Sequence, residues 1–200
     1  KDTIVVLWSD HGFHLGEKDH IEKFGLWEKS THIPFIVVVP GTTRPNTVCE
    51  RPVDLTVLYP TLLELCGLPP KQDLDGDSLA PLLDDPQAQR RKPAIIVEAG
   101  KHVAIRAERY RYVRYGDGSE ELYDHEKDSN EWTNRAKDPK LAEVKERLAK
   151  WIPKKWAKQA PSKNHYLFDP WKYEWTVKQT GAVISGGSCK IIPTPRKPKK

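Results

Sequence analysis

Two residues that commonly bind metals stand side by side directly after an apolar segment. Residues 4–8 (IVVLW) lead through Ser9 into Asp10 and His11. A continuous apolar run is typical of a buried parallel strand, and in open α/β sheets ligands sit beyond the carboxyl ends of such strands. A carboxylate at the tip of a core strand needs a cation or several hydrogen-bond donors. The residues alone allow two interpretations. Asp10 and His11 could form a metal site, or Asp10 could only cap a turn.

A charged loop over residues 10–32 follows this pair, and long loops in compact domains tend to be functional. Lys23 lies thirteen positions after Asp10, and an ammonium near a bound metal suits an anionic substrate such as a sulfate or phosphate ester. We predict that Lys23 has a catalytic role, in which it neutralises charge as the ester bond breaks. A solvated loop lysine is the alternative. His14 is a candidate substrate contact or acid–base group, and a polar loop histidine with neither role is the alternative.

Other charged residues of this region have simpler interpretations. We expect Glu28 to order the loop by pairing with a neighbouring cation. Lys18 and Lys29 fit solvated side chains. Asp75 and Asp77 flank a glycine before a predicted helix start, where capping explains them better than catalysis.

The order of the motifs along the chain resembles that of type I sulfatases in the alkaline phosphatase superfamily, and most of all the iduronate-2-sulfatase-like branch. The matching segments span roughly residues 1–150, and they are 9–12 (SDHG), 15–18 (LGEK), 26–34 (LWEKSTHIP), 39–41 (VPG), 59–67 (YPTLLELCG), 74–79 (LDGDSL) and 121–124 (ELYD), the last followed by Glu131 and Asn134. One such motif is weak evidence, whereas the ordered set is strong.

The resemblance implies roles for the candidate residues. Asp10 and His11 match metal ligands, Lys23 matches a lysine that contacts the sulfate ester, and Phe13 falls where this branch often lines its sugar pocket. The family further implies calcium, a formylglycine nucleophile, a sulfated carbohydrate as substrate, and a secreted, periplasmic or lysosomal location. Calcium prefers oxygen ligands and imidazole suits zinc or manganese better, so His11 leaves the identity of the metal open.

The chain lacks the segment that carries the nucleophile in this family, a Cys/Ser-x-Pro/Ala-x-Arg pattern. Its three cysteines are Cys49, Cys66 and Cys189, and the residues that follow each of them do not match. We interpret the chain as the C-terminal part of a longer sulfatase that is inactive alone. Its partner is then the N-terminal half of the catalytic domain, which would supply the formylglycine.

The composition narrows the classes of function. The chain has a net charge of +5 and 30% charged residues, and no apolar run approaches the about 18 residues that a membrane span requires. We expect no membrane partner and no specific nucleic-acid partner. A phosphodiesterase or phosphonate hydrolase of the same superfamily is the main enzymatic alternative. The basic residues 193–200 also leave open a noncatalytic, polyanion-binding role.

The predicted fold class is α/β, and the first of three parts is residues 1–92. We expect this part to be the C-terminal portion of an alkaline-phosphatase-like core with a mixed or parallel sheet. Its central strands would be residues 3–8 and 35–39. A helix over residues 54–65 would begin after Asp54 and stop at Gly67, and a short helix is expected over residues 78–83.

The pattern changes near residue 93. Four short segments rich in β-branched and aromatic residues predict an antiparallel meander, and they are 94–97, 102–106, 110–115 and 121–123. Asp138 and Pro139 predict the start of a helix that packs an apolar face on this sheet. Residues 93–152 thus form a small α+β subdomain with a C-terminal helix. Residues 153–200 are expected to be an extended basic tail that wraps the body.

Overall fold

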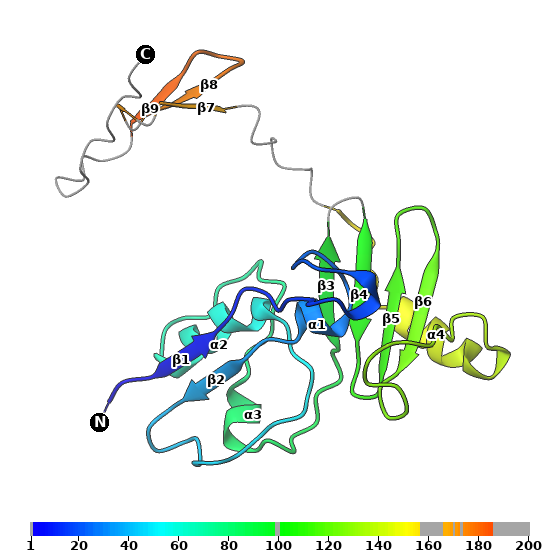
Figure 1. The fold of residues 1–200 in the computed structure, drawn as a ribbon. Helices are drawn as coiled ribbons and strands as arrows, with labels where there is room; N and C mark the ends of the chain where they lie inside the picture. Colours follow the sequence, from blue (N-terminus) through cyan, green and yellow to red (C-terminus); the bar gives the residue numbers. More distant parts are fainter. Residues whose placement is uncertain (1, 99–100, 157–165, 170, 173, 186–200) are drawn as a thin grey trace. The chain divides into compact units, whose positions relative to one another are not determined.

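The computed structural model describes residues 2–98, 101–156, 166–169, 171–172 and 174–185 (Figure 1). They belong to two compact units, Lys1–Trp156 and Ala157–Lys200. No helix among the described residues is both long and apolar enough to cross a bilayer. The predicted boundary at residue 92 lies inside the first unit and stays a prediction.

The first unit begins with a sheet of two strands that frames the candidate loop. β1 (Val5–Trp8) pairs antiparallel with β2 (Phe35–Val38). Between these strands lie the short 3-10 helix η1 (Glu17–Asp19) and the one-turn helix α1 (Glu28–Thr31). The loop therefore leaves the sheet at the end of β1 and returns to the neighbouring strand.

The prediction of parallel central strands is wrong for these two strands as the structure describes them. They are antiparallel, and Val5, Leu7 and Ile36 keep 52, 52 and 55% of their surface exposed. The apolar runs indicate that both faces of each strand favour burial, but a run does not specify which elements cover it. Within the described residues, β1 and β2 pair only with each other.

The segment after β2 folds into short helices. Asp54 begins the 3-10 helix η2 (Leu55–Val57), where its side chain accepts from the N–H of Thr56 at 3.1 Å. α2 (Leu58–Leu65) continues from η2, and the chain turns at Gly67 with a φ of +65°. Both end signals read from the sequence are thus confirmed. α3 (Ala80–Asp84) follows, and its Leu82 packs with Val57 of η2 and Leu79 in a small apolar cluster.

A four-stranded antiparallel meander follows, as predicted (Figure 1). Its strands are paired in the order β3-β4-β5-β6, and their bounds are Ala94–Glu98, His102–Arg106, Tyr110–Arg114 and Glu120–Asp124. The last hairpin turns at Gly118, which has a φ of +89°. Short β-branched and aromatic segments separated by turn residues are what such a sheet requires.

Different elements cover the two faces of the meander. On one face, Ile105 and Leu122 pack against Leu148 of α4 (Ala142–Ala149). This helix is preceded by η3 (Pro139–Leu141), which Asp138 caps, so the predicted helix start is confirmed. On the other face, Ala104 and Val113 pack against Leu26 of the candidate loop. The meander therefore joins its own helix to the loop that carries the candidate site residues.

The second unit contains a small sheet of its own. Where we expected an extended tail, the structure has a three-stranded antiparallel sheet of β7 (Tyr166–Asp169), β8 (Glu174–Val177) and β9 (Val183–Ser185). β8 and β9 are joined by a turn at Gly181, which has a φ of +68°. Strands of three or four residues carry too little periodicity to be recognised in a proline- and lysine-rich sequence. The basic residues 193–200 lie outside the described residues.

Candidate functional site

The turn after β1 brings Asp10 and His11 together at the surface. The Ser9 hydroxyl donates to the backbone oxygen of His11 at 2.8 Å, and the Ser9 N–H donates to the backbone oxygen of Pro34 at 3.3 Å. The carboxylate Oδ1 of Asp10 lies 3.7 Å from Nε2 of His11. The Asp10 side chain is 82% exposed and that of His11 is 35% exposed. Both metal-binding groups are therefore open to a ligand from solvent.

The other ring nitrogen of His11 decides which atom can bind a metal. Nδ1 lies 2.7 Å from the backbone oxygen of Gly12. Because a carbonyl oxygen can only accept, the neutral ring carries its proton on Nδ1 and keeps a lone pair on Nε2. Metal-binding histidines commonly donate their second N–H to a backbone carbonyl in this way. The donor set of Asp10 Oδ1 and His11 Nε2 therefore fits a divalent cation.

Gly12 allows this turn to approach α1 closely. Its N–H donates to the backbone oxygen of Ser30 at 2.7 Å. A Cβ added at Gly12 would stand 2.1 Å from the backbone oxygen of Lys29, a separation that real Cβ atoms essentially never show. Any other residue at this position would displace the turn and the two candidate ligands before it.

Lys23 and Phe13 remain at the surface of the loop. Lys23 is exposed, and its Nζ lies over the ring of Phe24 at 5.6 Å from the centroid. Within the described part of the chain, Lys23 forms no ion pair with Asp10. Phe13 is 47% exposed. The structure thus joins Asp10 to His11 and leaves the other two side chains accessible, and their roles in substrate contact stay predictions.

His14 lies inside the loop. Its ring makes edge contacts with His20 and Trp27, with centroids 5.1 and 5.7 Å apart, and it is 1% exposed. Nδ1 lies 3.3 Å from the backbone oxygen of Glu17. Burial lowers the pKa of His14 below its ordinary value and outweighs that hydrogen bond. This placement favours packing within the loop, and a contact between His14 and substrate stays a prediction.

Two arginines of the meander hold Glu28 at the start of α1. Nε of Arg106 donates to Oε2 of Glu28 at 3.1 Å, and Nη2 of Arg111 pairs with the same oxygen. Burial acts to raise the pKa of Glu28, but the two guanidinium groups outweigh it and lower the pKa to about 2. The expectation that Glu28 orders the loop through a cation is therefore confirmed.

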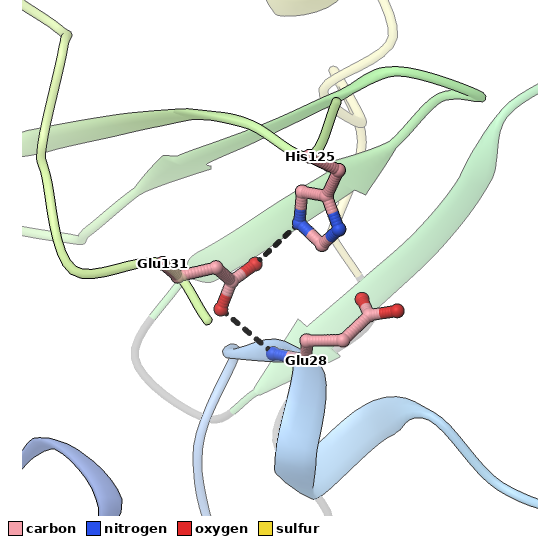
Figure 2. A group of neighbouring side chains, drawn as sticks. All are labelled: Glu28, His125 and Glu131. Atoms are coloured by element: carbon pink, nitrogen blue, oxygen red, sulfur yellow. Dashed lines mark hydrogen bonds and ion pairs between the residues drawn. The ribbon is translucent and has the colours of Figure 1, made fainter. Parts of the chain in front are cut away.

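Glu131 joins this cluster from the loop after β6 (Figure 2). Its Oε2 accepts from the N–H of Glu28 at 2.8 Å, and its Oε1 lies 2.8 Å from Nε2 of His125. The possible ligand atoms of these three residues lie within 4.8 Å of one another. However, Arg111 pairs with both carboxylates, and its Nε lies 2.6 Å from Glu131 Oε1. The guanidinium groups of Arg106 and Arg111 already balance the two carboxylates, so we interpret the cluster as a salt-bridge network.

Lys18, which we expected to be solvated, is partly buried. Its Nζ donates to the hydroxyl of Tyr123 at 3.1 Å and to the backbone oxygen of Glu131 at 2.5 Å. The rings of Trp27 and Tyr123 lie 4.8 and 4.7 Å from Nζ. A lysine in a charged loop carries no local signal of these hydrogen bonds, because both acceptors lie more than 100 positions away in the sequence.

A cleft of about 750 Å³ lies between α1 and the turns of the meander. Its charged lining is largely paired, as in the ion pairs of Arg106 with Glu28 and of Arg109 with Glu126. The lining residues are Glu28, Lys29, His32, Glu50, Arg51, Pro86, Gln87, Arg106, Glu108, Arg109, His125, Glu126, Ser129 and Asn130. None of the site residues predicted from the sequence lines this cleft.

Comparison with known proteins identifies the family. The family described as N-sulphoglucosamine sulphohydrolase, C-terminal, matches residues 16–158. The chain belongs to the sulfatase family. A sulfatase of Formosa agariphila is 36% identical over 192 residues, which cover 96% of this chain and 37% of that protein. A delta 4,5-hexuronate-2-O-sulfatase of Bacteroides thetaiotaomicron is 32% identical over 160 residues, which cover 72% of this chain and 32% of that protein.

Solved structures share the fold of this sulfatase chain. A 2-O GAG sulfatase is 28% identical with a TM-score of 0.62, over 74% of this chain and 34% of that one. A phosphonate monoester hydrolase of Agrobacterium radiobacter is 29% identical with a TM-score of 0.59, over the same shares of the two chains. The mixed α/β, alkaline-phosphatase-like class is therefore confirmed.

This sulfatase chain spans about a third of the length of the relatives that it matches. The matched family description is that of a C-terminal region, so the chain corresponds to a C-terminal portion, as expected. Sulfatases generally use a divalent metal and a formylglycine.

Proposed function

We propose that this chain is the C-terminal part of an enzyme that hydrolyses sulfate esters of carbohydrates. Two relatives support this substrate class, the delta 4,5-hexuronate-2-O-sulfatase and the 2-O GAG sulfatase. The observation that carries the proposal is the pair of Asp10 and His11, whose metal-binding atoms lie 3.7 Å apart and open to solvent at the end of β1. A cation held there would attract and polarise an anionic ester.

Each residue of the loop has a proposed task. Asp10 and His11 would hold one divalent metal, which we assign as calcium from the family, and the cation would supply positive charge to an anionic ester. The backbone oxygen of Gly12 keeps the His11 ring in the tautomer with Nε2 free. Lys23 donates to the sulfate group and stabilises the charge that develops as the S–O bond breaks. Phe13 is the proposed contact to the sugar.

The remaining machinery is proposed to lie outside this chain. The nucleophile would be a formylglycine in the N-terminal half of the same catalytic domain, so the chain alone should not turn over substrate. By analogy with the family, the whole enzyme would be secreted, periplasmic or lysosomal. Its proposed partners are the sulfated carbohydrate and that N-terminal half.

Hydrolysis of a phosphonate monoester is the second candidate function. The solved phosphonate monoester hydrolase favours it. This chain is about as similar to that hydrolase as to the solved 2-O GAG sulfatase. Both substrates are tetrahedral anions, and a metal beside a lysine suits either of them. The two candidates therefore differ in substrate preference rather than in the features of this loop.

A comparison of two substrates separates the candidates. The full-length protein is assayed for sulfate release from a 2-O-sulfated uronate disaccharide and for hydrolysis of a phenyl phosphonate monoester. We expect kcat/KM for the sulfate ester to exceed that for the phosphonate at least about 100-fold, which corresponds to about 2.7 kcal/mol of differential transition-state binding. A preference of the same size for the phosphonate would contradict the proposal and support the second candidate.

A further inference from the structure

Strained backbone positions face each other where the meander meets the loop. Glu131 is 1% exposed and has a φ of +60°, in the left-handed region that residues other than glycine seldom adopt. On the loop, Lys18 and Asp19 have φ values of +59° and +55°. Such conformations persist only where the surrounding structure holds them, and they gather at functional sites.

The first contact between these strained segments lies at Lys18. Its Nζ donates to the backbone oxygen of Glu131 at 2.5 Å and to the hydroxyl of Tyr123 at 3.1 Å. The same ammonium lies over the rings of Trp27 and Tyr123, where cation–π attraction stabilises it. The loop is thus attached to the meander at residue 18.

A second attachment lies eight residues further along, at Leu26. Nη1 of the buried Arg111 donates to the backbone oxygen of Leu26 at 2.8 Å, and Nη2 donates to the hydroxyl of Thr31 at 3.0 Å. Glu131 accepts from the N–H of Glu28 at 2.8 Å and pairs with Nε of Arg111 at 2.6 Å. Glu131 therefore acts at both attachments, through its carbonyl at one and its carboxylate at the other.

Residues 19–25 form the segment between the two attachments, and Lys23 lies on it. Ile21 and Phe24 are 73 and 62% exposed, so the segment has little apolar packing of its own. It does hold internal hydrogen bonds, such as that from His20 Nε2 to the backbone oxygen of Phe24 at 2.6 Å. The N–H of His14 donates to the backbone oxygen of Glu22 at 3.0 Å, which joins the middle of the segment to the first half of the loop. Its two ends are the points at which the meander holds it.

We propose that Lys18, Arg111 and Glu131 are positioning residues, together a loop clamp, that hold Lys23 in place for its contact with the sulfate ester. The inference rests on the proposed function, because that function assigns the contact to Lys23. A misplacement of about 1 Å can cost about 100-fold in rate. The meander therefore contributes to the reaction through the position of Lys23.

A double-mutant cycle in the full-length protein tests the clamp. Removal of Arg111 or Glu131 would leave a buried charge unpaired and risks unfolding, so the cycle uses Lys18→Met, Lys23→Ala and the double variant. Methionine keeps the apolar packing between Trp27 and Tyr123 but cannot donate to Glu131. We expect Lys18→Met to lower kcat for sulfate release at least about tenfold, and to cost less than about twofold once Lys23 is alanine.

Matched variants separate positioning from general stability. Lys18→Arg keeps a charged donor and should recover most of kcat, whereas Lys127→Met removes an exposed lysine of the loop after β6 and should match the wild type. Amides of residues 19–25 should exchange hydrogen at least about tenfold faster in Lys18→Met, while those of β4 and β5 stay unchanged. The content of bound metal should also stay unchanged.

The outcomes distinguish this inference from the proposed function. If Lys23→Ala lowers kcat and Lys18→Met does not, the clamp is refuted and the proposed function stands. If the losses of Lys18→Met and Lys23→Ala add, Lys18 acts independently of Lys23 and the clamp is again refuted. If Lys23→Ala keeps the wild-type kcat, the role proposed for Lys23 fails, and the clamp fails with it.

Discussion

At the scale of single residues, Glu28 shows how strongly the meander holds the loop. Arg106 and Arg111 both pair with its carboxylate. Its pKa falls from an ordinary value of 4.5 to about 2, because these guanidinium groups outweigh the opposing effect of burial. A depressed carboxylate pKa adds stability that is fully present above the unfolded-state pKa and is lost as the pH falls through the folded-state pKa. The relevant window runs from pH 4.5 down to about 2.

We expect Glu28→Gln to lower the free energy of unfolding by about 3 kcal/mol at pH 7, because the change removes the carboxylate charge that Arg106 and the buried Arg111 share. The deficit relative to the wild type should be smaller at about pH 3, where the wild type has already lost part of this stabilisation. Urea denaturation of the full-length protein at both pH values measures the deficit.

A matched control is Glu108→Gln. Glu108 pairs with Arg51, but its side chain is 56% exposed, so we expect a loss below about 1 kcal/mol. A deficit for Glu28→Gln that is equally large at both pH values would show that the ion pairs do not cause it.

At the scale of elements, the turn between β1 and the rest of the loop depends on Gly12. A Cβ there would collide with the backbone oxygen of Lys29 in α1. We expect Gly12→Ala to lower both the melting temperature and the rate of sulfate release, the latter at least about tenfold, because the turn that carries Asp10 and His11 must move. Kinetics and thermal unfolding of the full-length protein measure the two effects.

Gly118→Asn provides the control for this prediction. Unlike Gly12, Gly118 has a positive φ, and no heavy atom lies within 4 Å of an added Cβ there. Asparagine tolerates this left-handed region better than other residues do. This variant should stay close to the wild type. Wild-type kinetics and melting temperature for Gly12→Ala would refute the close approach of the turn to α1.

The attachment of α4 to the meander is a second prediction at this scale. Leu148 is 3% exposed and packs against Val103, Ile105 and Tyr112. We expect Leu148→Ala to cost about 2 to 5 kcal/mol of unfolding free energy, because it removes buried methyl groups and leaves a cavity. Urea denaturation measures this cost, with the exposed Lys150→Ala as control. A loss below about 0.5 kcal/mol for Leu148→Ala would mean that α4 does not pack as described.

At the scale of the whole molecule, local signals explain what the sequence predicted. The meander was predictable because its turns and β-branched segments lie close together in the chain, and α4 because Asp138 and Pro139 mark its start. Asp10 and His11 were predictable as a pair because they are adjacent. These features need no knowledge of how distant segments meet.

Contacts between distant segments explain what could not be predicted. Lys18 meets Glu131 across 113 positions, and Arg111 meets Glu28 across 83. No periodicity or turn signal in a single sequence encodes such pairs. The antiparallel pairing of β1 with β2 could not be predicted either. An apolar run predicts that a strand is buried, but not whether the neighbouring strand runs parallel or antiparallel to it.

The most direct test of the central claim is the rate of sulfate release and the content of bound metal in the full-length protein with Asp10→Ala. If Asp10 and His11 hold the metal of a sulfatase, this variant should lose the metal, and kcat should fall at least about 100-fold. Asp2→Ala, at an exposed aspartate ahead of β1, should keep both. Wild-type metal content and sulfate release in Asp10→Ala would contradict the account.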